Sequence, residues 1–216
     1  MDQQNYLISP SLSLEQLNLD PPVKLGIMAS GNGSNFEALI QAIADGKLRA
    51  VIPLLIYNNP GAKVAARAQL WGVPAILLNH RDFSRREDLD RKIVEKFQEA
   101  GVELIVMAGW MRVVTPVLLD AFPGKIVNIH PSLLPSFKGV RAVEQALAAN
   151  VKITGCTAHL VSLEVDSGKI LLQAAVPILP NDTAETLHKR IQIREHQILP
   201  QAIAIATQES RQREFN

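Results

Sequence analysis

The sequence predicts an α/β fold, a Rossmann-like open sheet that is mostly parallel and carries helices on both faces. From Val23 onward, short apolar runs with strand character alternate with longer runs of helical periodicity, which is the pattern of parallel β-α-β units. Two further strand-like runs in the C-terminal half have no helical run between them. They predict an antiparallel edge on the same sheet.

The predicted elements follow the chain in a regular order. In the first half they are a strand over Val23–Ala29, a helix from about Asn35, a strand over Ala50–Tyr57, a helix over Ala62–Trp71, a strand over Ala75–Leu78, a helix over Arg85–Ala100 and a strand over Val102–Met107. In the second half they are a short helix from Thr115, a strand over Ile126–Ile129, a helix over Arg141–Ala149, strands near Thr157–Val161 and Ile170–Val176, and a long helix from Thr183. The strands are short and apolar, whereas the helices mix apolar and polar residues.

Periodicity and capping residues support the helices. Apolar residues recur every three or four positions in the predicted helix over Arg85–Ala100, so they line one face of it. Ser84 is followed three residues later by Glu87, and Ser34 is followed likewise by Glu37. This spacing predicts a capping box at the start of each of the two helices.

Length and composition predict one folded domain. A chain of 216 residues, 47% of them hydrophobic, can bury a sizeable core. Residues 1–22 carry scattered leucines and Pro21-Pro22, so we interpret them as an N-terminal extension that is flexible or draped on the surface. Residues 23–216 are the predicted domain, which contains no internal repeat.

The near-neutral charge favours small-molecule partners. Twenty-two Lys and Arg against 21 Asp and Glu give a formal charge of +1, without the basic excess expected for binding nucleic acid. No signal peptide and no run of about 18 apolar residues is present, so we expect a cytoplasmic protein without a membrane partner. The single cysteine, Cys156, is expected to be a small buried hydrophobe. The sequence leaves open whether the chain forms a homodimer.

The run Val127–Pro135 holds the strongest candidates for catalysis. Asn128 and His130 lie two residues apart at the end of a predicted strand, so their side chains project from the same face. An amide can donate a hydrogen bond to a developing oxyanion while an imidazole donates or moves a proton, which suits a reaction at a carbonyl group. The alternative interpretation is a loop cap without chemistry.

A glycine-rich turn follows the first predicted strand. Gly31, Asn32, Gly33 and Ser34 precede the next helix, where backbone N–H groups and the helix N-terminus favour an anion. Phe36 replaces the third glycine of a dinucleotide fingerprint, and no Gly-Lys-Ser or Gly-Lys-Thr completes a P-loop. The predicted ligand is a single phosphate monoester, and the alternative is a tight turn with nothing bound.

The remaining ionisable candidates depend on contacts that the sequence does not reveal. Asp166 lies in a predicted turn, where a solvated carboxylate is the default role. Beside His130 it would favour the imidazolium and fix the ring. His159 is expected to be a hydrogen-bonded core histidine, and the other histidines lack companions at metal-ligand spacing. No metal is predicted.

Several motifs together resemble the phosphoribosylglycinamide formyltransferases over about residues 23 to 206. These motifs are Ser30–Asn35, Ala108–Arg112, Asn128–Pro135, Gly155–His159 and Glu195-His196. The Asn-x-His-Pro-Ser-Leu-Leu-Pro segment with a downstream Asp marks the wider group of enzymes that use 10-formyltetrahydrofolate, whereas the glycine turn points to the purine-pathway members. The resemblance implies that a formyl group passes directly from this co-substrate to the glycine amine of 5-phosphoribosylglycinamide in a ternary complex.

The resemblance also implies roles for individual residues. The implied catalytic residues are Asn128, His130 and Asp166. The implied phosphoribosylglycinamide site comprises Gly31, Asn32, Gly33, Ser34, Gln192 and Glu195. The implied folate site comprises Arg86, Met111, Arg112, Val113, Val114 and Asn128, together with the loop residues Ser162, Leu163, Glu164, Val165 and Asp166. Without the resemblance, Met111 and Val113 are interpreted as core and Arg86 as a solvated helix charge. One departure is Val143, which stands where several relatives carry a histidine.

Three alternatives compete with this function. A 10-formyltetrahydrofolate hydrolase shares the Asn, His and Asp, but similar hydrolases carry an extra N-terminal regulatory domain of about 80 residues. A non-catalytic nucleotide-sensing module would keep the glycine turn without needing Asn128, His130 or Asp166. An enzyme that formylates transfer RNA is disfavoured by the near-neutral charge and the missing C-terminal domain.

Overall fold

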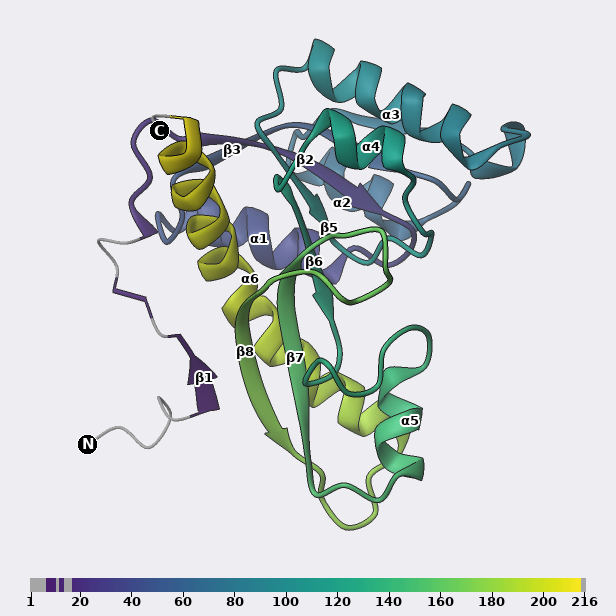
Figure 1. Ribbon diagram of the computed structural model, residues 1–216, viewed down its shortest axis with the longest axis vertical. Coiled ribbons are helices and arrows are strands. Elements are labelled where there is room, and N and C mark those ends of the chain that lie inside the picture. The colour runs from purple at the N-terminus through teal and green to yellow at the C-terminus, as the bar shows by residue number, and fades with distance from the viewer. Residues whose placement is uncertain (1–6, 11, 14–16, 215–216) are drawn as a thin grey trace.

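The computed structural model describes residues 7–10, 12–13 and 17–214. Within these residues, an eight-stranded sheet runs in the order β1-β8-β7-β6-β5-β2-β3-β4, with helices packed around it (Figure 1). The strands are β1 (Ile8–Ser9), β2 (Val23–Ala29), β3 (Ala50–Tyr57), β4 (Ala75–Leu77), β5 (Leu104–Met107), β6 (Ile126–His130), β7 (Ile153–Leu160) and β8 (Ile170–Pro177). The helices are α1 (Ser34–Ala44), α2 (Lys63–Leu70), the 3₁₀ turn η3 (His80–Asp82), α3 (Arg86–Glu99), α4 (Pro116–Ala121), α5 (Ala142–Ala148) and α6 (Ala184–Glu214).

The sheet is mixed, as the sequence predicts. β4, β3, β2, β5 and β6 are parallel neighbours, whereas β7, β8 and β1 continue the sheet in antiparallel pairing. The predicted parallel sheet with an antiparallel edge is therefore confirmed. Because β2, β5 and β6 are adjacent and parallel, their carboxyl ends meet at one edge, which is where ligands bind in open α/β sheets.

Two apolar clusters lie on opposite faces of this sheet. Successive residues of a strand face opposite sides, so Ile27 packs with α1, α2, α5 and α6, whereas Met28 packs with α3 and α4. Phe36 of α1 and Phe97 of α3 are the largest fully buried side chains of the two clusters. Helices thus cover both faces, and the clusters hold the strand ends of the sheet in a fixed register.

The long helix α6 connects the core to the carboxyl edge. It packs against β6, β7, β8, α1 and α5, and it buries Leu187 and Ile191 on the inner side. Gln192 and Glu195 follow on the same helix near the start of α1. Among the residues that the structure describes, no helix, including α6, is long and apolar enough to cross a membrane.

Both predicted capping boxes are wrong. The N-cap of α1 is Gly33 and that of α3 is Arg85, and neither makes a side-chain capping bond. Ser34 lies inside α1, where its hydroxyl oxygen accepts a hydrogen bond from Gln192 instead. Ser84 precedes the N-cap of α3 by one residue, so its side chain is out of phase with the free N–H groups of the first turn. A tertiary contact explains the error at Ser34, and a one-residue shift of the helix start explains the error at Ser84.

The described part of residues 1–22 lies against the domain. Ile8 and Ser9 form β1 and pair with Ala174 and Gln173 of β8, and Leu19 is buried in the larger cluster. The division of the chain at residue 22 stays a prediction, as does the predicted flexibility of the extension. Residues 1–6, 11 and 14–16, on which part of that prediction falls, lie outside the described residues.

Gly155 provides a test of how tightly β7 and β8 pair. A Cβ atom at this position would lie 2.0 Å from the carbonyl oxygen of Ala174 on β8. We expect Gly155→Ala to lower the free energy of unfolding by about 1–3 kcal/mol, because the two strands must separate to admit the methyl group. Urea denaturation measures this change. Gly31→Ala is the control, since a Cβ there meets nothing within 4 Å, and equal stability of both variants would refute the expectation.

Candidate active site

The carboxyl ends of β2, β5 and β6 bring three predicted motifs to one edge of the sheet. The glycine turn follows β2, the Ala108–Arg112 motif follows β5, and Asn128 and His130 end β6. The strand register aligns Met28 with Met107 and Met107 with Asn128. Segments that are far apart in the chain therefore form one site, as the strand pattern predicts.

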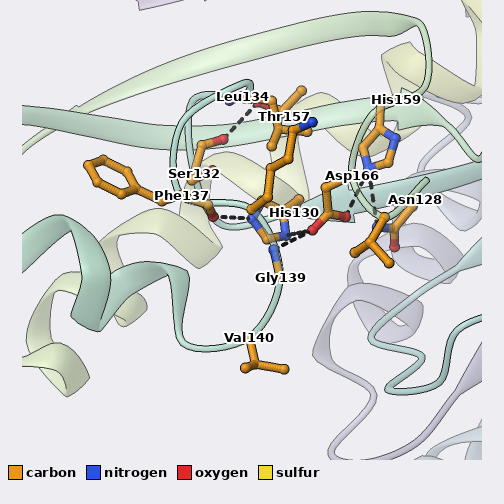
Figure 2. A network of polar contacts seen from close by, with 12 residues as sticks. Asn128, His130, Ser132, Leu134, Phe137, Gly139, Val140, Thr157, His159 and Asp166 are labelled. Carbon is orange, nitrogen blue, oxygen red and sulfur yellow. Dashed lines mark hydrogen bonds and ion pairs between the residues drawn. The ribbon is translucent and has the colours of Figure 1, made fainter.

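Asp166 lies beside His130, which the sequence alone does not reveal. Its Oδ2 atom is 3.3 Å from Nδ1 of His130, and both side chains are more than nine-tenths buried. The same oxygen accepts a hydrogen bond of 2.8 Å from the backbone N–H of Gly139 (Figure 2). Asp166 has a positive φ of 50° in the turn between β7 and β8. The carboxylate is therefore held from two sides at the histidine ring.

Both ring nitrogens of His130 face oxygen atoms. Nε2 lies 2.8 Å from the carbonyl oxygen of Phe137, opposite the Asp166 contact at Nδ1. A neutral imidazole carries one N–H and can donate to only one of these acceptors, whereas the imidazolium donates to both. The ring is therefore held at both nitrogens, by Asp166 at Nδ1 and by the carbonyl oxygen of Phe137 at Nε2.

His159 joins the site from the antiparallel neighbour strand. Its Nε2 atom lies 3.5 Å from Oδ1 of Asp166 and 3.2 Å from Nδ2 of Asn128 (Figure 2). Its Nδ1 atom lies 2.9 Å from the carbonyl oxygen of Leu160. When Nδ1–H donates to Leu160, a neutral ring accepts from the Asn128 amide at Nε2. A protonated ring donates to Asp166 instead. His159 is buried, as predicted, but sequence reasoning missed that it contacts two candidate catalytic residues.

The pKa of Asp166 reflects this environment. Burial alone raises the pKa of its carboxyl group, but hydrogen bonds from His159 and Gly139 and the nearby charges of His130 and His159 outweigh burial. The pKa of Asp166 therefore lies below its ordinary value. The carboxylate stays ionised at neutral pH and is available to hold a cationic ring.

The glycine turn is shaped by α2. Gly33 has a φ of 76°, and a Cβ atom there would lie 2.5 Å from Val64 Cγ2. The backbone N–H of Val64 donates to the carbonyl oxygen of Gly31, and Nε of Arg67 donates to that of Asn32 at 2.8 Å. Gly31 and Asn32 remain exposed at the N-terminus of α1. The turn is thus preformed and open, as an anion site requires.

The residues implied for phosphoribosylglycinamide come together around this turn. Nε2 of Gln192 donates to Oγ of Ser34 at 3.2 Å, and Nδ2 of Asn35 donates to Oε2 of Glu195 at 3.0 Å. Both contacts join α6 to the start of α1. The structure therefore assembles the implied set, which sequence spacing could not place because its two halves lie about 160 residues apart.

The residues implied for folate are only partly assembled. Met111 and Val113 are exposed, at 79% and 46%, so their interpretation as core from the sequence alone is wrong. Met111 is anchored through its backbone N–H, which donates to Oγ of Ser30 at 2.9 Å. Val114 is buried in the α3–α4 cluster, so its side chain is packed in the core. Of the remaining members, Arg86 is exposed at the start of α3, Arg112 is half-buried directly after Met111, and Ser162, Leu163, Glu164 and Val165 lie in the turn that carries Asp166.

The fold agrees with comparisons to known proteins. Residues 23–203 match the protein family described as formyl transferase. The chain belongs to the formyl transferase family. It is 41% identical over 180 residues to the phosphoribosylglycinamide formyltransferase of Bacillus subtilis, a match that covers 83% of this chain and 92% of that protein.

Solved structures of similar formyl transferases share the fold. Glycinamide ribonucleotide transformylase 1 from Symbiobacterium toebii has a TM-score of 0.83 at 41% identity and covers 85% of this chain and 86% of its own. Phosphoribosylglycinamide formyltransferase from Bacillus halodurans has a TM-score of 0.81 at 43% identity and covers 85% and 94%. The trifunctional purine biosynthetic protein adenosine-3 of Drosophila melanogaster is 42% identical over 84% of this chain, which spans only 14% of that longer protein.

Glu195 is a second buried carboxyl group of this formyl transferase. Only 4% of it is exposed, and Asn35, which donates a hydrogen bond to it, is itself buried. Burial raises the pKa of Glu195, and the hydrogen bond from Asn35 and the charge of His188 oppose that effect only in part. An ionised Glu195 at neutral pH therefore costs stability in the absence of a ligand that donates hydrogen bonds to it.

The Asp166 contacts predict a pH dependence of stability. Because its folded-state pKa is lowered, the carboxylate stabilises the fold above about pH 4, the unfolded pKa, and this contribution is lost as the pH falls through the folded pKa. We expect Asp166→Asn to reduce the loss of unfolding free energy between about pH 5 and pH 3 relative to wild type. Urea denaturation across this range measures both slopes, and identical slopes would contradict the lowered pKa.

A Glu195→Gln variant tests the opposite dependence of stability on pH. A raised folded-state pKa means that the folded protein gains protons relative to the unfolded chain, so stability falls as the pH rises from about 4 through the folded pKa. We expect Glu195→Gln to be more stable than wild type at neutral pH and to lose that advantage in acid. Thermal unfolding at neutral pH and at acidic pH measures the stability difference. Glu185→Gln, on the exposed side of α6, is the control. A less stable glutamine variant at neutral pH would count against the burial argument.

Proposed function

We propose that this formyl transferase moves the formyl group of 10-formyltetrahydrofolate to the glycine amine of 5-phosphoribosylglycinamide, by direct transfer while both substrates are bound. The observation that carries the proposal is the Asp166–His130 contact beside Asn128, at the same sheet edge as the preformed glycine turn. The Asp166, His130 and Asn128 side chains suit transfer of a formyl group, and the glycine turn suits binding of a phosphate. The names of the relatives supply the purine-pathway substrates.

Asn128 and His130 would stabilise the charge that develops on the formyl oxygen. Attack of the amine nitrogen on the formyl carbon forms a new C–N bond and places negative charge on that oxygen. Nδ2 of Asn128 donates a hydrogen bond to it, and the imidazolium of His130 stabilises it as a nearby cation. When the tetrahedral species collapses, the bond to the folate nitrogen breaks, and His130 supplies the proton that this nitrogen takes.

Asp166 would keep the site in its working protonation state. Its carboxylate favours the imidazolium of His130 and fixes the ring through Nδ1. The proton that the attacking amine loses then passes towards Asp166, through water, and restores the balance once His130 has given up its own. His159 would orient Asn128 and the second oxygen of the carboxylate, because it lies within 3.5 Å of both.

The acceptor would bind at the glycine turn. Exposed backbone at Gly31 and Asn32, the left-handed Gly33 and the N-terminus of α1 suit the ribose phosphate. Glu195 would accept hydrogen bonds from ribose hydroxyls or from the glycinamide part, which offsets the cost of its burial. Gln192 would extend this polar wall along α6. A phosphate anchored here directs the amine of the acceptor towards Asn128 at the end of β6.

The folate would bind on the side of β5 and of the Asp166 turn. Exposed Met111 and Val113 offer apolar contact, and backbone groups of Ser162–Asp166 offer hydrogen bonds to the edge of a pteridine ring. Arg86 and Arg112 would supply positive charge for the carboxylates of the folate tail. Small-molecule substrates of this kind fit a cytoplasmic enzyme, and a homodimer stays a prediction. The hydrolase alternative is not favoured, because the similar proteins are named formyltransferases.

Loss of 10-formyl folate, followed by absorbance with and without 5-phosphoribosylglycinamide, tests the function. We expect consumption to require the acceptor, and Asn128→Ala to lower kcat by about 10²–10³-fold because one oxyanion donor is lost. His130→Ala should lower kcat at least as strongly, since it removes both the cation and the proton donor.

Gln69→Ala, which removes an exposed amide from α2, is the control and should turn over like wild type. Formate release without acceptor would indicate the hydrolase instead. Full turnover in either site variant would remove that residue from the mechanism.

A further inference from the structure

The two halves of the His130–Asp166 pair lie on different loops. His130 ends β6 and continues into the segment 131–141, whereas Asp166 lies in the segment 162–168 between β7 and β8. One link between these segments is the hydrogen bond from Gly139 to Asp166. A second link is the side chain of Lys138, whose Nζ donates to Oγ of Ser167 at 2.5 Å and lies 3.3 Å from Oε1 of Glu164. Lys138 therefore reaches residues on both sides of Asp166.

We propose that Lys138 is a positioning residue, which holds the turn of Asp166 against His130 and so sets the geometry of the catalytic pair. The proposal rests on the proposed function, since it assigns a role within that site. It adds a residue that belongs to none of the motifs and to none of the implied catalytic or binding sets. Lys138 has no contact with a reacting atom in this scheme and acts through Asp166.

The turn depends on the hydroxyl group that Lys138 contacts. Oγ of Ser167 accepts from the ammonium and donates to the carbonyl oxygen of Val165 at 2.9 Å, so one hydroxyl connects Lys138 to the peptide that precedes Asp166. Asp166 needs such support because its positive φ of 50° is unfavourable for a residue with a side chain. Fixing the direction of the Ser167 hydroxyl therefore helps to hold Asp166 in this conformation.

Lys138 is itself held in place. Nε2 of Gln145 on α5 donates to the carbonyl oxygens of Lys138 and Val140, at 3.1 and 2.9 Å. The backbone N–H of the next residue, Gly139, donates to Oδ2 of Asp166. The side chain of Lys138 and the backbone of Gly139 thus bracket Asp166 from a segment that α5 anchors. A shift of Lys138 would move both contacts together.

The two contacts of the Lys138 ammonium group contribute unequally to holding the turn. Glu164 is 78% exposed at its side chain, and an ion pair so open to solvent contributes little. Ser167 is half-buried, and its bond to Lys138 is short and charge-assisted. The Ser167 contact is therefore the one that positions the turn, and removal of the Glu164 charge should matter least.

Kinetics of Lys138→Met test the proposal. We expect kcat to fall by about 10- to 100-fold, since small displacements of a catalytic group are costly, with the KM for 5-phosphoribosylglycinamide nearly unchanged. The charged groups that face Asp166 are His130 and His159, with Lys138 and Glu164 at the rim of its turn. Weaker contacts to the carboxylate raise its pKa, so the acid limb of the kcat profile should move to higher pH.

Four variants separate positioning from general damage. Ser167→Ala should lower kcat in the same direction as Lys138→Met, Lys138→Arg should restore part of the activity, and Glu164→Gln should change little. Lys152→Met is the matched control, because this exposed lysine precedes β7, at the end of the strand opposite the Asp166 turn. Wild-type kcat and an unmoved acid limb in Lys138→Met would overturn the proposal, as would an equal loss in Lys152→Met.

A second measurement does not depend on turnover. Carbon NMR of the Asp166 carboxyl group follows its titration in wild type and in Lys138→Met, and we expect the midpoint to rise in the variant. An unchanged midpoint would refute the positioning role. Absence of acceptor-dependent transfer in the wild-type protein would contradict the proposed function alone, because the titration still shows whether Lys138 holds Asp166.

Discussion

The carboxylate of Asp166 lies between two imidazole rings, and the site is organised around it. One oxygen faces His130 and the backbone of Gly139, and the other faces His159, which in turn contacts Asn128. A buried carboxylate is stable only when its charge is compensated, and here that compensation comes from groups on β6, β7 and the loop after β6. Loss of the carboxylate would leave two buried rings without a common partner.

The sheet makes this convergence possible. Parallel β2, β5 and β6 deliver the glycine turn, the Met111 segment and Asn128 to one edge, whereas antiparallel β7 brings His159 opposite Asn128. A parallel β7 would have needed a crossover connection and would have entered the sheet at its other end. Because β7 runs opposite to β6, its last residue Leu160 pairs with Val127 near the start of β6, and the turn after β7 folds back from there until Asp166 contacts His130 and His159.

Local sequence patterns were sufficient for most of the fold. The predicted bounds of β2 and β3 coincide with the observed ones, because branched apolar runs bounded by turn residues leave little choice of register. The capping boxes failed because a side chain at the correct spacing can be drawn into a tertiary contact, as Ser34 is by Gln192. β7 begins at Ile153, earlier than its predicted core near Thr157, because pairing with β8 extends the strand over weakly apolar residues.

The candidate site was predictable only in part. Asn128 and His130 share a strand face, which their spacing alone reveals. The catalytic role of Asp166, in contrast, was implied by the family resemblance. His159 and Lys138 depend on strand pairing and loop contacts between distant residues, for which a single sequence carries no signal. Met111 and Val113 have apolar side chains that composition assigns to the core, although they lie exposed beside the anchor at Ser30.

Strand β1 has a consequence for the behaviour of the protein in concentrated solution. A sheet that ended at β8 would present a row of unpaired N–H and C=O groups to other chains, and such edges invite intermolecular strand pairing. Ile8 and Ser9 occupy part of that edge by pairing with Ala174 and Gln173. By this pairing, residues 8 and 9 cover part of the β8 edge and leave less of it open to strand addition by another chain.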